Sequence, residues 1–194
     1  LASSWDRELV AGAGKTIAKE ARAEGVAVLL GPAINMKRSP LCGRNFEYYS
    51  EDPFLAGELA ASFVNAVQAE GVGTSAKHFA VNNQETRRHS TSANLSMRAL
   101  REIYLAAFEI VVKKSQPATI MHSYNRINGT NASISAWLLN DILREEWGYE
   151  GFVMSDWNAM YERAGSLEAG CELEMPASAG VRDRDIIDAV RSGR

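Results

Sequence analysis

Apolar residues recur along the chain in two alternating patterns, one typical of amphipathic helices and the other of short buried strands. The first helical stripe consists of Leu9, Val10, Ala13, Ile17 and Ala21. Ser4 before the stripe predicts the N-cap of this helix, and Gly25 after it predicts the end. Residues 26–30 (VAVLL) then form a continuous apolar run, which predicts a strand buried on both faces.

Helices and strands of the same kinds alternate along the rest of the chain. The further predicted helices cover residues 53–71, 100–111, 135–148, 160–167 and 185–191. The further predicted strands cover residues 73–77, 118–122, 151–155 and 171–175. This alternation predicts an α/β fold with a parallel sheet and right-handed crossovers, for which an open doubly wound sheet and a (β/α)8 barrel are both candidates.

The loops after the first predicted strands are long and polar, above all residues 31–52 and 80–96, whereas the turns before the strands are short. Loops after parallel strands lie at the carboxyl edge of the sheet, where both candidate folds place their sites. No glycine-rich phosphate-binding motif opens a helix, so a nucleotide-binding fold has no support. Because a complete barrel needs about 250 residues, we predict that residues 1–194 form a single partial (β/α)8 TIM-type barrel domain. Its parallel strands, about five in number, would alternate with helices.

Composition narrows the classes of function. Apolar residues make up 46% of the chain, and 21 basic residues stand against 24 acidic ones, for a net charge of −3. This balance is typical of a globular domain and disfavours nucleic-acid and membrane partners. The three histidines form no HxH or HxxxH pair, and the two cysteines form no CxxC motif. Neither a metal site nor a cofactor is therefore expected.

Charged and aromatic side chains gather where the predicted strands end. The candidate site residues are Arg44, Lys77, His78, Arg88, Tyr124, Asp156 and Trp157. In a parallel barrel all of them would lie on one rim. A carboxylate such as Asp156 among cations is a candidate nucleophile, because cations lower its pKa and keep it ionised. Trp157 offers a flat apolar face to a sugar ring or another ligand.

Each of these residues also has a structural explanation. An acidic residue after a strand often caps the next helix, so Asp156 could be an N-cap. His78 could be a hydrogen-bonded structural histidine. Arg44 and Arg88 could be solvated or paired on the surface, and Tyr124 could satisfy loop carbonyls. Position alone leaves these alternatives open.

Five motifs follow one another at compatible spacing. They are SPLCGRNFEYYSEDP (39–53), KHFAVNNQETRR (77–88), SYNRINGT (123–130), LLNDILREEWGYEGFVMSDW (138–157) and AGCELEMP (169–176). Through these motifs the chain, from about residue 5 to residue 176, resembles glycoside hydrolase family 3, the beta-glucosidase group. The resemblance implies that Asp156, in the Ser-Asp-Trp motif, is the catalytic nucleophile. It implies that the sugar-binding residues are Arg44, Lys77, His78, Arg88, Tyr124 and Trp157.

The resemblance also implies a reaction. Members of this family release terminal beta-D-glucosyl or related beta-glycosyl residues by double displacement with retention of configuration. A second carboxylic acid, about 5–5.5 Å from the nucleophile, protonates the leaving oxygen and later activates water. Residues 77–85 read KHFAVNNQE, unlike the KHFPGHG loop of the branch that acts on N-acetylglucosamine. Glucosides are therefore the first expectation, followed by xylosides, arabinosides and glycosylated natural products.

Two elements of the family pattern are not found in this sequence. The first is an acidic sugar-binding residue in an Asp-Gly-Pro segment that belongs to the first strand region. The second is the general acid/base, which the resemblance assigns to a domain C-terminal to the barrel. The local carboxylates Glu162, Glu168, Glu172 and Glu174 do not match that role. We therefore expect these 194 residues alone to be inactive without a missing domain or a second chain, since loss of acid catalysis costs about 10²–10⁴-fold.

Two alternative functions remain at this stage. A non-catalytic sugar-binding or interaction module of the same fold would keep Lys77, His78 and Arg88 but would need no acid/base. The second alternative is a barrel enzyme that binds a phosphate group. It lacks support, because no glycine-rich loop opens the last helix. The sequence does not indicate a cellular compartment.

Overall fold

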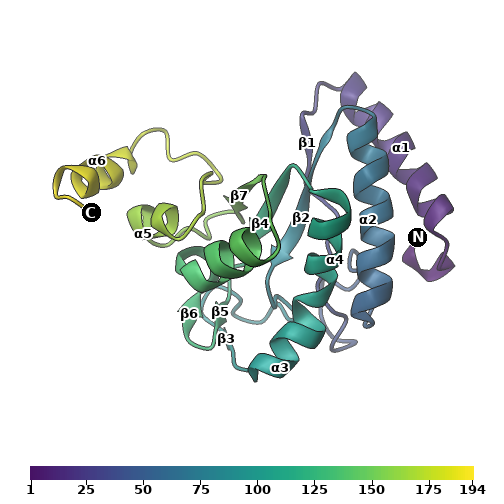
Figure 1. Cartoon of the computed structure of the whole chain (residues 1–194), viewed down its shortest axis with the longest axis horizontal. Helices are drawn as coiled ribbons and strands as arrows, with labels where there is room; N and C mark the ends of the chain where they lie inside the picture. The colour runs from purple at the N-terminus through teal and green to yellow at the C-terminus, as the bar shows by residue number, and fades with distance from the viewer.

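The computed structural model describes all 194 residues and arranges them as a parallel sheet with helices packed against it (Figure 1). The main sheet has the strand order β1-β2-β4-β7. These strands are Val28–Leu29, Gly73–Phe79, Thr119–His122 and Phe152–Ser155. All three pairings are parallel. The strands follow chain order without the reversal that a doubly wound sheet contains, so the barrel-type arrangement is confirmed, as an open sheet of four strands.

The predicted fifth strand, residues 171–175, is wrong as a regular strand. Leu173 makes a single parallel bridge to Met154. The backbone N–H groups of Glu172 and Leu173 both donate to the Val153 carbonyl, at 3.0 and 3.1 Å. The Leu173 carbonyl also accepts from the Ser155 N–H at 2.9 Å. The Met175 N–H then binds the Ser155 hydroxyl at 2.8 Å instead of a backbone carbonyl, so the segment accompanies β7 without extending the sheet as a regular strand.

Two long helices cover the N-terminal half of the sheet. Helix α1 (Arg7–Ala23) packs along α2 (Pro53–Ala69), which in turn packs on α4 (Ala106–Ser115). The prediction that Ser4 caps α1 is wrong, because the Asp6 carboxylate accepts from the N–H groups of Glu8 and Leu9. Residues 2–4 form a separate 3₁₀ turn.

The predicted helix at 100–111 is composite. It consists of α3 (Met97–Ala99), a π-helical segment η2 (Leu100–Tyr104) and α4. The predicted helix at 135–148 is likewise a π-helix, η4 (Trp137–Glu146). Helix α5 (Arg163–Glu168) begins three residues later than predicted, where the Glu162 side chain caps it. The last helix is α6 (Asp183–Arg191).

One strand of the second long loop and two strands of the segment after β4 form a small sheet that the sequence pattern did not predict. Its strands are β3 (Ser92–Ala93), β5 (Arg126–Ile127) and β6 (Thr130–Asn131), in the order β3-β5-β6. Residues 132–134 then form the 3₁₀ turn η3 (Ala132–Ile134). This sheet ties the loop after β2 to the segment after β4, at the rim where the candidate site lies.

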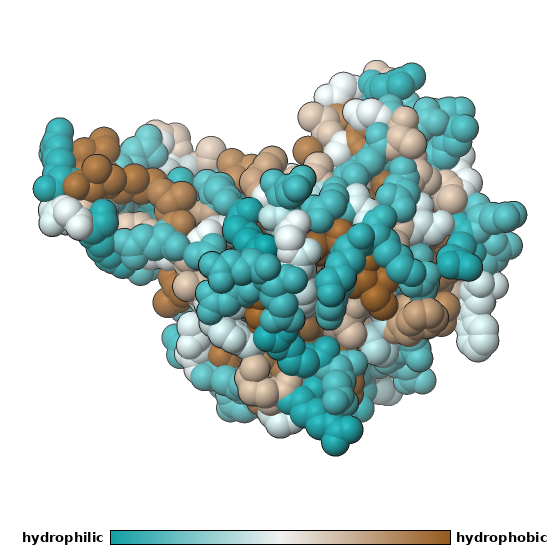
Figure 2. All heavy atoms as spheres, in the orientation of Figure 1, coloured by the Kyte–Doolittle hydropathy of each residue, from teal (hydrophilic) through white to brown (hydrophobic).

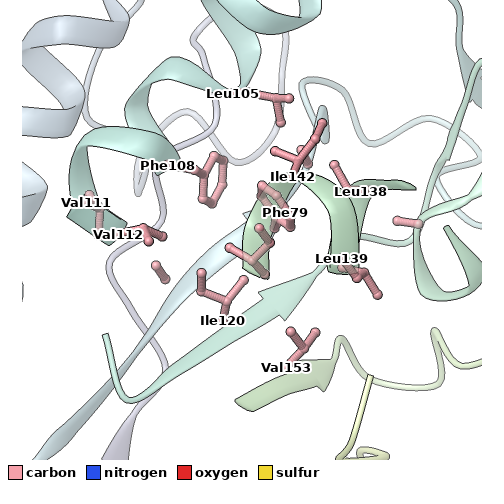
Figure 3. Close-up of a cluster of buried hydrophobic side chains, with 14 of the residues drawn as sticks. Phe79, Leu105, Phe108, Val111, Val112, Ile120, Leu138, Leu139, Ile142 and Val153 are labelled. Atoms are coloured by element: carbon pink, nitrogen blue, oxygen red, sulfur yellow. The ribbon is translucent and has the colours of Figure 1, made fainter. Parts of the chain in front are cut away.

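The main hydrophobic core lies between the main sheet and the helical segments α2, η2, α4 and η4 (Figure 3). The Phe79 ring at the end of β2 is centred 5.1 Å from the Phe108 ring of α4 and 5.9 Å from the Trp147 ring. Ile120 and Leu138 fill the same cluster. Full burial of each such side chain contributes about 1.5–3 kcal/mol, so the core fixes the strand ends that carry the site.

The C-terminal end of the chain projects from the body, opposite α1 (Figure 1). Helix α6 buries none of its residues. Apolar side chains lie exposed along this arm (Figure 2), among them Val181, Ile187 and Val190. None of the helices has the length and apolar character that crossing a membrane requires.

Candidate active site

The carboxyl ends of three neighbouring strands bring predicted site residues together. Lys77 and His78 lie near the end of β2, and Asp156 directly follows β7. Tyr124 lies two residues beyond the end of β4. The His78 Nε2 and Asp156 Oδ2 atoms are 3.5 Å apart. These side chains therefore share one rim of the sheet, as the loop pattern predicted.

Asp156 is 8% exposed, and its two carboxylate oxygens have different surroundings. Oδ1 accepts a hydrogen bond from the backbone N–H of Trp157 at 2.7 Å. Oδ2 is buried and has no hydrogen-bond partner. The alternative of a helix N-cap does not hold, because Glu162 caps the next helix through Gly165 N. Oδ2 therefore receives no hydrogen bond from the protein and lies beside the His78 ring.

The pKa of the Asp156 carboxyl is raised above its ordinary value, chiefly because burial removes the carboxylate from water. The Trp157 N–H, the Tyr124 hydroxyl, Arg44 and Arg88 favour the charged form and offset part of this effect. The expectation that nearby cations give Asp156 a low pKa is therefore wrong. Desolvation is the larger influence in this buried position.

Asn35 holds the imidazole of His78 in one orientation. The Asn35 amide nitrogen donates to the His78 carbonyl at 2.9 Å, and Asn35 Oδ1 accepts from the His78 backbone N–H at 2.9 Å. The same oxygen lies 3.2 Å from His78 Nδ1. Since Oδ1 can only accept, we assign the proton to Nδ1, which leaves Nε2 as an acceptor on the side of Asp156.

His78 is neutral in the folded protein. Its pKa lies well below the ordinary value, first because of burial and then because Arg44, Lys77 and Arg88 lie nearby. The Tyr48 ring packs edge-on against the imidazole, with ring centroids 6.3 Å apart. The histidine therefore offers a hydrogen-bond acceptor and no positive charge to a ligand beside Asp156.

Glu47 joins two of the predicted cations. Its Oε1 lies 2.5 Å from Arg44 Nε, and its Oε2 lies 3.5 Å from Lys77 Nζ. All three side chains are about four-fifths buried. Sequence reasoning did not single out Glu47. The available signal was its position three residues after Arg44 in the GRNFE segment, a spacing at which opposite charges can pair.

Arg88 and Tyr124 form a stacked pair near Asp156. The Arg88 guanidinium lies 4.3 Å from the centre of the Tyr124 ring, and its Nη1 binds Glu85 Oε2 at 2.8 Å. His89 packs on the same ring at 4.2 Å. Burial raises the pKa of Tyr124 to about 12, with Asp156 as the next cause. Tyr124 is therefore a neutral hydroxyl whose ring contacts both Arg88 and His89.

Trp157 differs from the other predicted residues. Its backbone N–H binds Asp156, but the residue is 40% exposed. Asn158 follows with a positive φ of 61°, and its N–H donates to the Met175 carbonyl at 2.9 Å. The turn directs the chain away from the sheet and leaves the Trp157 ring at the edge of the site. No group of three or more His, Cys, Asp or Glu side chains is arranged to hold a metal ion.

Comparison with known proteins places this arrangement in a family. The model of the glycosyl hydrolase family 3 N-terminal domain matches residues 1–194. The chain belongs to this family. It is 53% identical, over its whole length, to thermostable beta-glucosidase B of Acetivibrio thermocellus. It is 58% identical, also over its whole length, to an exo-alpha-(1->6)-L-arabinopyranosidase of Bifidobacterium breve.

Solved structures of glycosyl hydrolase family 3 proteins share the fold. The family 3 beta-glucosidase of Bifidobacterium adolescentis superposes with a TM-score of 0.96 at 58% identity, over 99% of this chain and 28% of that one. Beta-glucosidase 3B of Thermotoga neapolitana, solved in complex with glucose, gives 0.95 at 53% identity over the same shares. The chain spans 26% and 25% of the two curated relatives, about a quarter of their length.

Proposed function

We propose that this family 3 domain carries the nucleophile and most of the sugar-binding groups of a retaining exo-glycosidase. The substrates are terminal beta-D-glucosyl or related beta-glycosyl residues. The observation that carries the proposal is the buried Asp156 carboxylate, whose Oδ2 has no partner and faces His78 at 3.5 Å. The relatives are named as beta-glucosidases and as an arabinopyranosidase, which supports a glycoside substrate.

In this reaction a carboxylate oxygen of Asp156 attacks the anomeric carbon as the bond to the leaving oxygen breaks. The product of the first step is a glycosyl ester of Asp156, and water hydrolyses that ester in the second step. The Trp157 N–H binds Oδ1 and so limits rotation of the carboxylate. The Tyr124 hydroxyl, Arg44 and Arg88 stabilise the charged form against the cost of burial.

The remaining side chains bind hydroxyl groups of the same sugar. His78 Nε2 accepts a hydroxyl proton, while Lys77 and Arg44 donate to hydroxyl oxygens from positions fixed by Glu47. Trp157 forms the edge of the pocket. Hydrogen bonds of this kind accelerate the reaction to the extent that they strengthen in the transition state.

The general acid/base comes, in this proposal, from outside these 194 residues, in another domain or a second chain. The two carboxylates near the pocket are Glu47 and Glu85, and all four of their oxygens already contact protein groups. Glu47 contacts Arg44 and Lys77, and Glu85 contacts Arg88 and Asn82. Neither presents a free acid to a leaving oxygen, which supports an external donor.

An activated 2-deoxy-2-fluoro-glucoside tests the proposal. Its good leaving group removes the need for an acid, and its fluorine slows hydrolysis of the ester, so intact-mass measurement would detect one added glycosyl unit. We expect Asp156→Asn to abolish this increment. Asp141→Asn, which makes the same change at an exposed position in η4, should retain it. Absence of labelling in folded protein would overturn the nucleophile assignment and favour a non-catalytic sugar-binding module.

A further inference from the structure

Asn35 lies in the long loop after β1, and the backbone places it directly beside His78 of β2. Ala33 forms a parallel bridge with Lys77, and the Ile34 N–H donates to the Lys77 carbonyl at 2.8 Å. Asn35 is 2% exposed and His78 is 1% exposed. The two side chains therefore meet inside the protein, where bulk water does not compete for their hydrogen bonds.

The backbone of His78 fixes which way the Asn35 amide points. Nδ2 donates to the His78 carbonyl and Oδ1 accepts from the His78 N–H, each at 2.9 Å. A reversed amide would place its NH₂ group against that N–H and its oxygen against that carbonyl, so both hydrogen bonds would be lost. Oδ1 therefore faces the imidazole as an acceptor, and two contacts that do not involve the ring hold it there.

The other two states of the imidazole conflict with this arrangement. A proton on Nε2 alone would leave the Nδ1 lone pair 3.2 Å from Asn35 Oδ1, so that two acceptors would face each other. An imidazolium would add a buried charge near Arg44, Lys77 and Arg88. Burial and these three cations hold the pKa of His78 well below its ordinary value. The remaining state is a neutral ring with its proton on Nδ1.

The position of this proton decides what the Asp156 carboxylate meets. His78 Nε2 lies 3.5 Å from Asp156 Oδ2, so a small movement would bring a proton on Nε2 into a hydrogen bond with the carboxylate. Hydrogen bonds to an ionised acceptor are among the strong ones. Such a bond would stabilise the carboxylate before attack and would weaken as its charge is lost to the new ester. An interaction that is stronger in the ground state than in the transition state slows the reaction.

We propose that Asn35 is a positioning residue of the candidate active site. It holds the His78 proton on Nδ1, which prevents the imidazole from donating to Asp156 and presents Nε2 to the sugar as an acceptor. The effect on the reaction rests on the proposed function, in which Asp156 is the nucleophile. The position of the proton does not, because Asn35 fixes it without a ligand.

Long-range proton–nitrogen NMR of the 194-residue chain tests the proposal, since protonated and unprotonated ring nitrogens differ in chemical shift. His78→Gln identifies the His78 signals by their loss. In the wild type near neutral pH we expect the proton on Nδ1. Asn35→Leu replaces the amide by an apolar side chain of similar size. In this variant we expect the proton to move to Nε2, where Asp156 accepts it.

The labelling rate of Asp156 by the activated 2-deoxy-2-fluoro-glucoside, at saturating reagent, measures the consequence for the reaction. We expect Asn35→Leu to lower this rate at least about tenfold, which corresponds to about 1.4 kcal/mol. The control is Asn140→Leu, the same substitution at a half-buried asparagine of η4 whose Nδ2 donates to the Glu168 carbonyl at 3.2 Å. It also removes a hydrogen bond, and it should change neither the His78 signals nor the labelling rate.

A proton on Nε2, or on both nitrogens, of wild-type His78 would overturn the proposal. An Nδ1 proton that stays in place in folded Asn35→Leu would also overturn it, and so would an unchanged labelling rate in a variant whose proton has moved. The wild-type spectrum needs no variant at Asn35, so it decides the assignment even if Asn35→Leu does not fold. Because that spectrum needs no reagent, failure of Asp156 to label is distinguishable from failure at Asn35.

Discussion

His122 shows how a single buried side chain couples protonation to folding. It is fully buried at the end of β4, with Nδ1 3.0 Å from the Ser123 carbonyl and with Nε2 unpartnered. Burial lowers its pKa to about 4, against about 6.5 in the unfolded chain. The unfolded chain therefore binds more protons than the folded one between these values. The contribution of neutral His122 to the free energy of unfolding is fully present above about pH 6.5. It is lost as the pH falls toward about 4.

From His122 alone we expect the free energy of unfolding to fall by about 2 kcal/mol between about pH 7 and about pH 5. His122→Gln removes the titrating group, so urea denaturation at the two pH values should show a loss smaller by about this amount. His78 acts in the same direction and leaves a residual slope. His89→Gln, at an exposed position, is the matched control. Equal pH dependence in the wild type and in His122→Gln would contradict the argument.

The candidate site also shows which properties of a residue can be inferred from sequence. The position of Asp156 after an apolar strand and its Ser-Asp-Trp motif singled it out. The direction of its pKa shift was not accessible, because that depends on how burial compares with four separate favourable contacts. Asn35 was missed because its contact with His78 joins residues 43 positions apart. An asparagine in a polar loop carries no local signal of such a partner.

At the scale of elements, a glycine controls how closely α2 and α4 approach. A Cβ atom added at Gly57 would lie 2.8 Å from the Cβ and Cδ1 atoms of Ile110. Gly57→Ala gains up to about 1 kcal/mol of helix propensity, but overpacking of this kind costs about 1–3 kcal/mol. Since Cβ is fixed to the α4 backbone, we expect the clash to prevail and the variant to be less stable by about 1–2 kcal/mol.

Gly12 in α1 provides the comparison. An added Cβ there meets no atom within 4 Å, so Gly12→Ala should stabilise the protein by about 0.5–1 kcal/mol. Urea denaturation of both variants and of the wild type measures the two changes in the free energy of unfolding, which should have opposite signs. A stabilising effect at both positions would show that α2 and α4 can separate at no cost.

Elements with long or continuous apolar patterns were predicted well, and those without were not. The strand predicted at 73–77 is extended by two residues in β2, and the helix predicted at 53–71 matches α2. The two-residue strands of the β3-β5-β6 sheet are too short to show a period. The failure at 171–175 has a different cause, since its apolar alternation is real but the Met175 N–H binds the Ser155 hydroxyl instead of a strand carbonyl. Hydrogen-bond register of that kind is set by the folded partner strand.

For the whole molecule, stability is distributed unevenly between the sheet and the C-terminal arm. The strands and helices from α1 to η4 share buried cores, whereas α6 buries no residue. Arg194 contacts Glu162 and Glu168 in half-exposed ion pairs, and such pairs contribute little. Segments with few buried contacts open at low free-energy cost, so the arm should open while the sheet stays folded.

Limited trypsin digestion should therefore cut first at Arg184 or Arg191, which are exposed in the arm, and leave a large fragment that resists further cleavage. Arg144 is the internal comparison, because it lies in η4 with its guanidinium bound to the Gly151 carbonyl at 3.0 Å. Mass measurement of the earliest fragments identifies the order of cleavage. Early cleavage at Arg144 would mean that the sheet opens as readily as the arm. Added salt should speed cleavage in the arm alone, since exposed ion pairs are screened and the apolar cores are not.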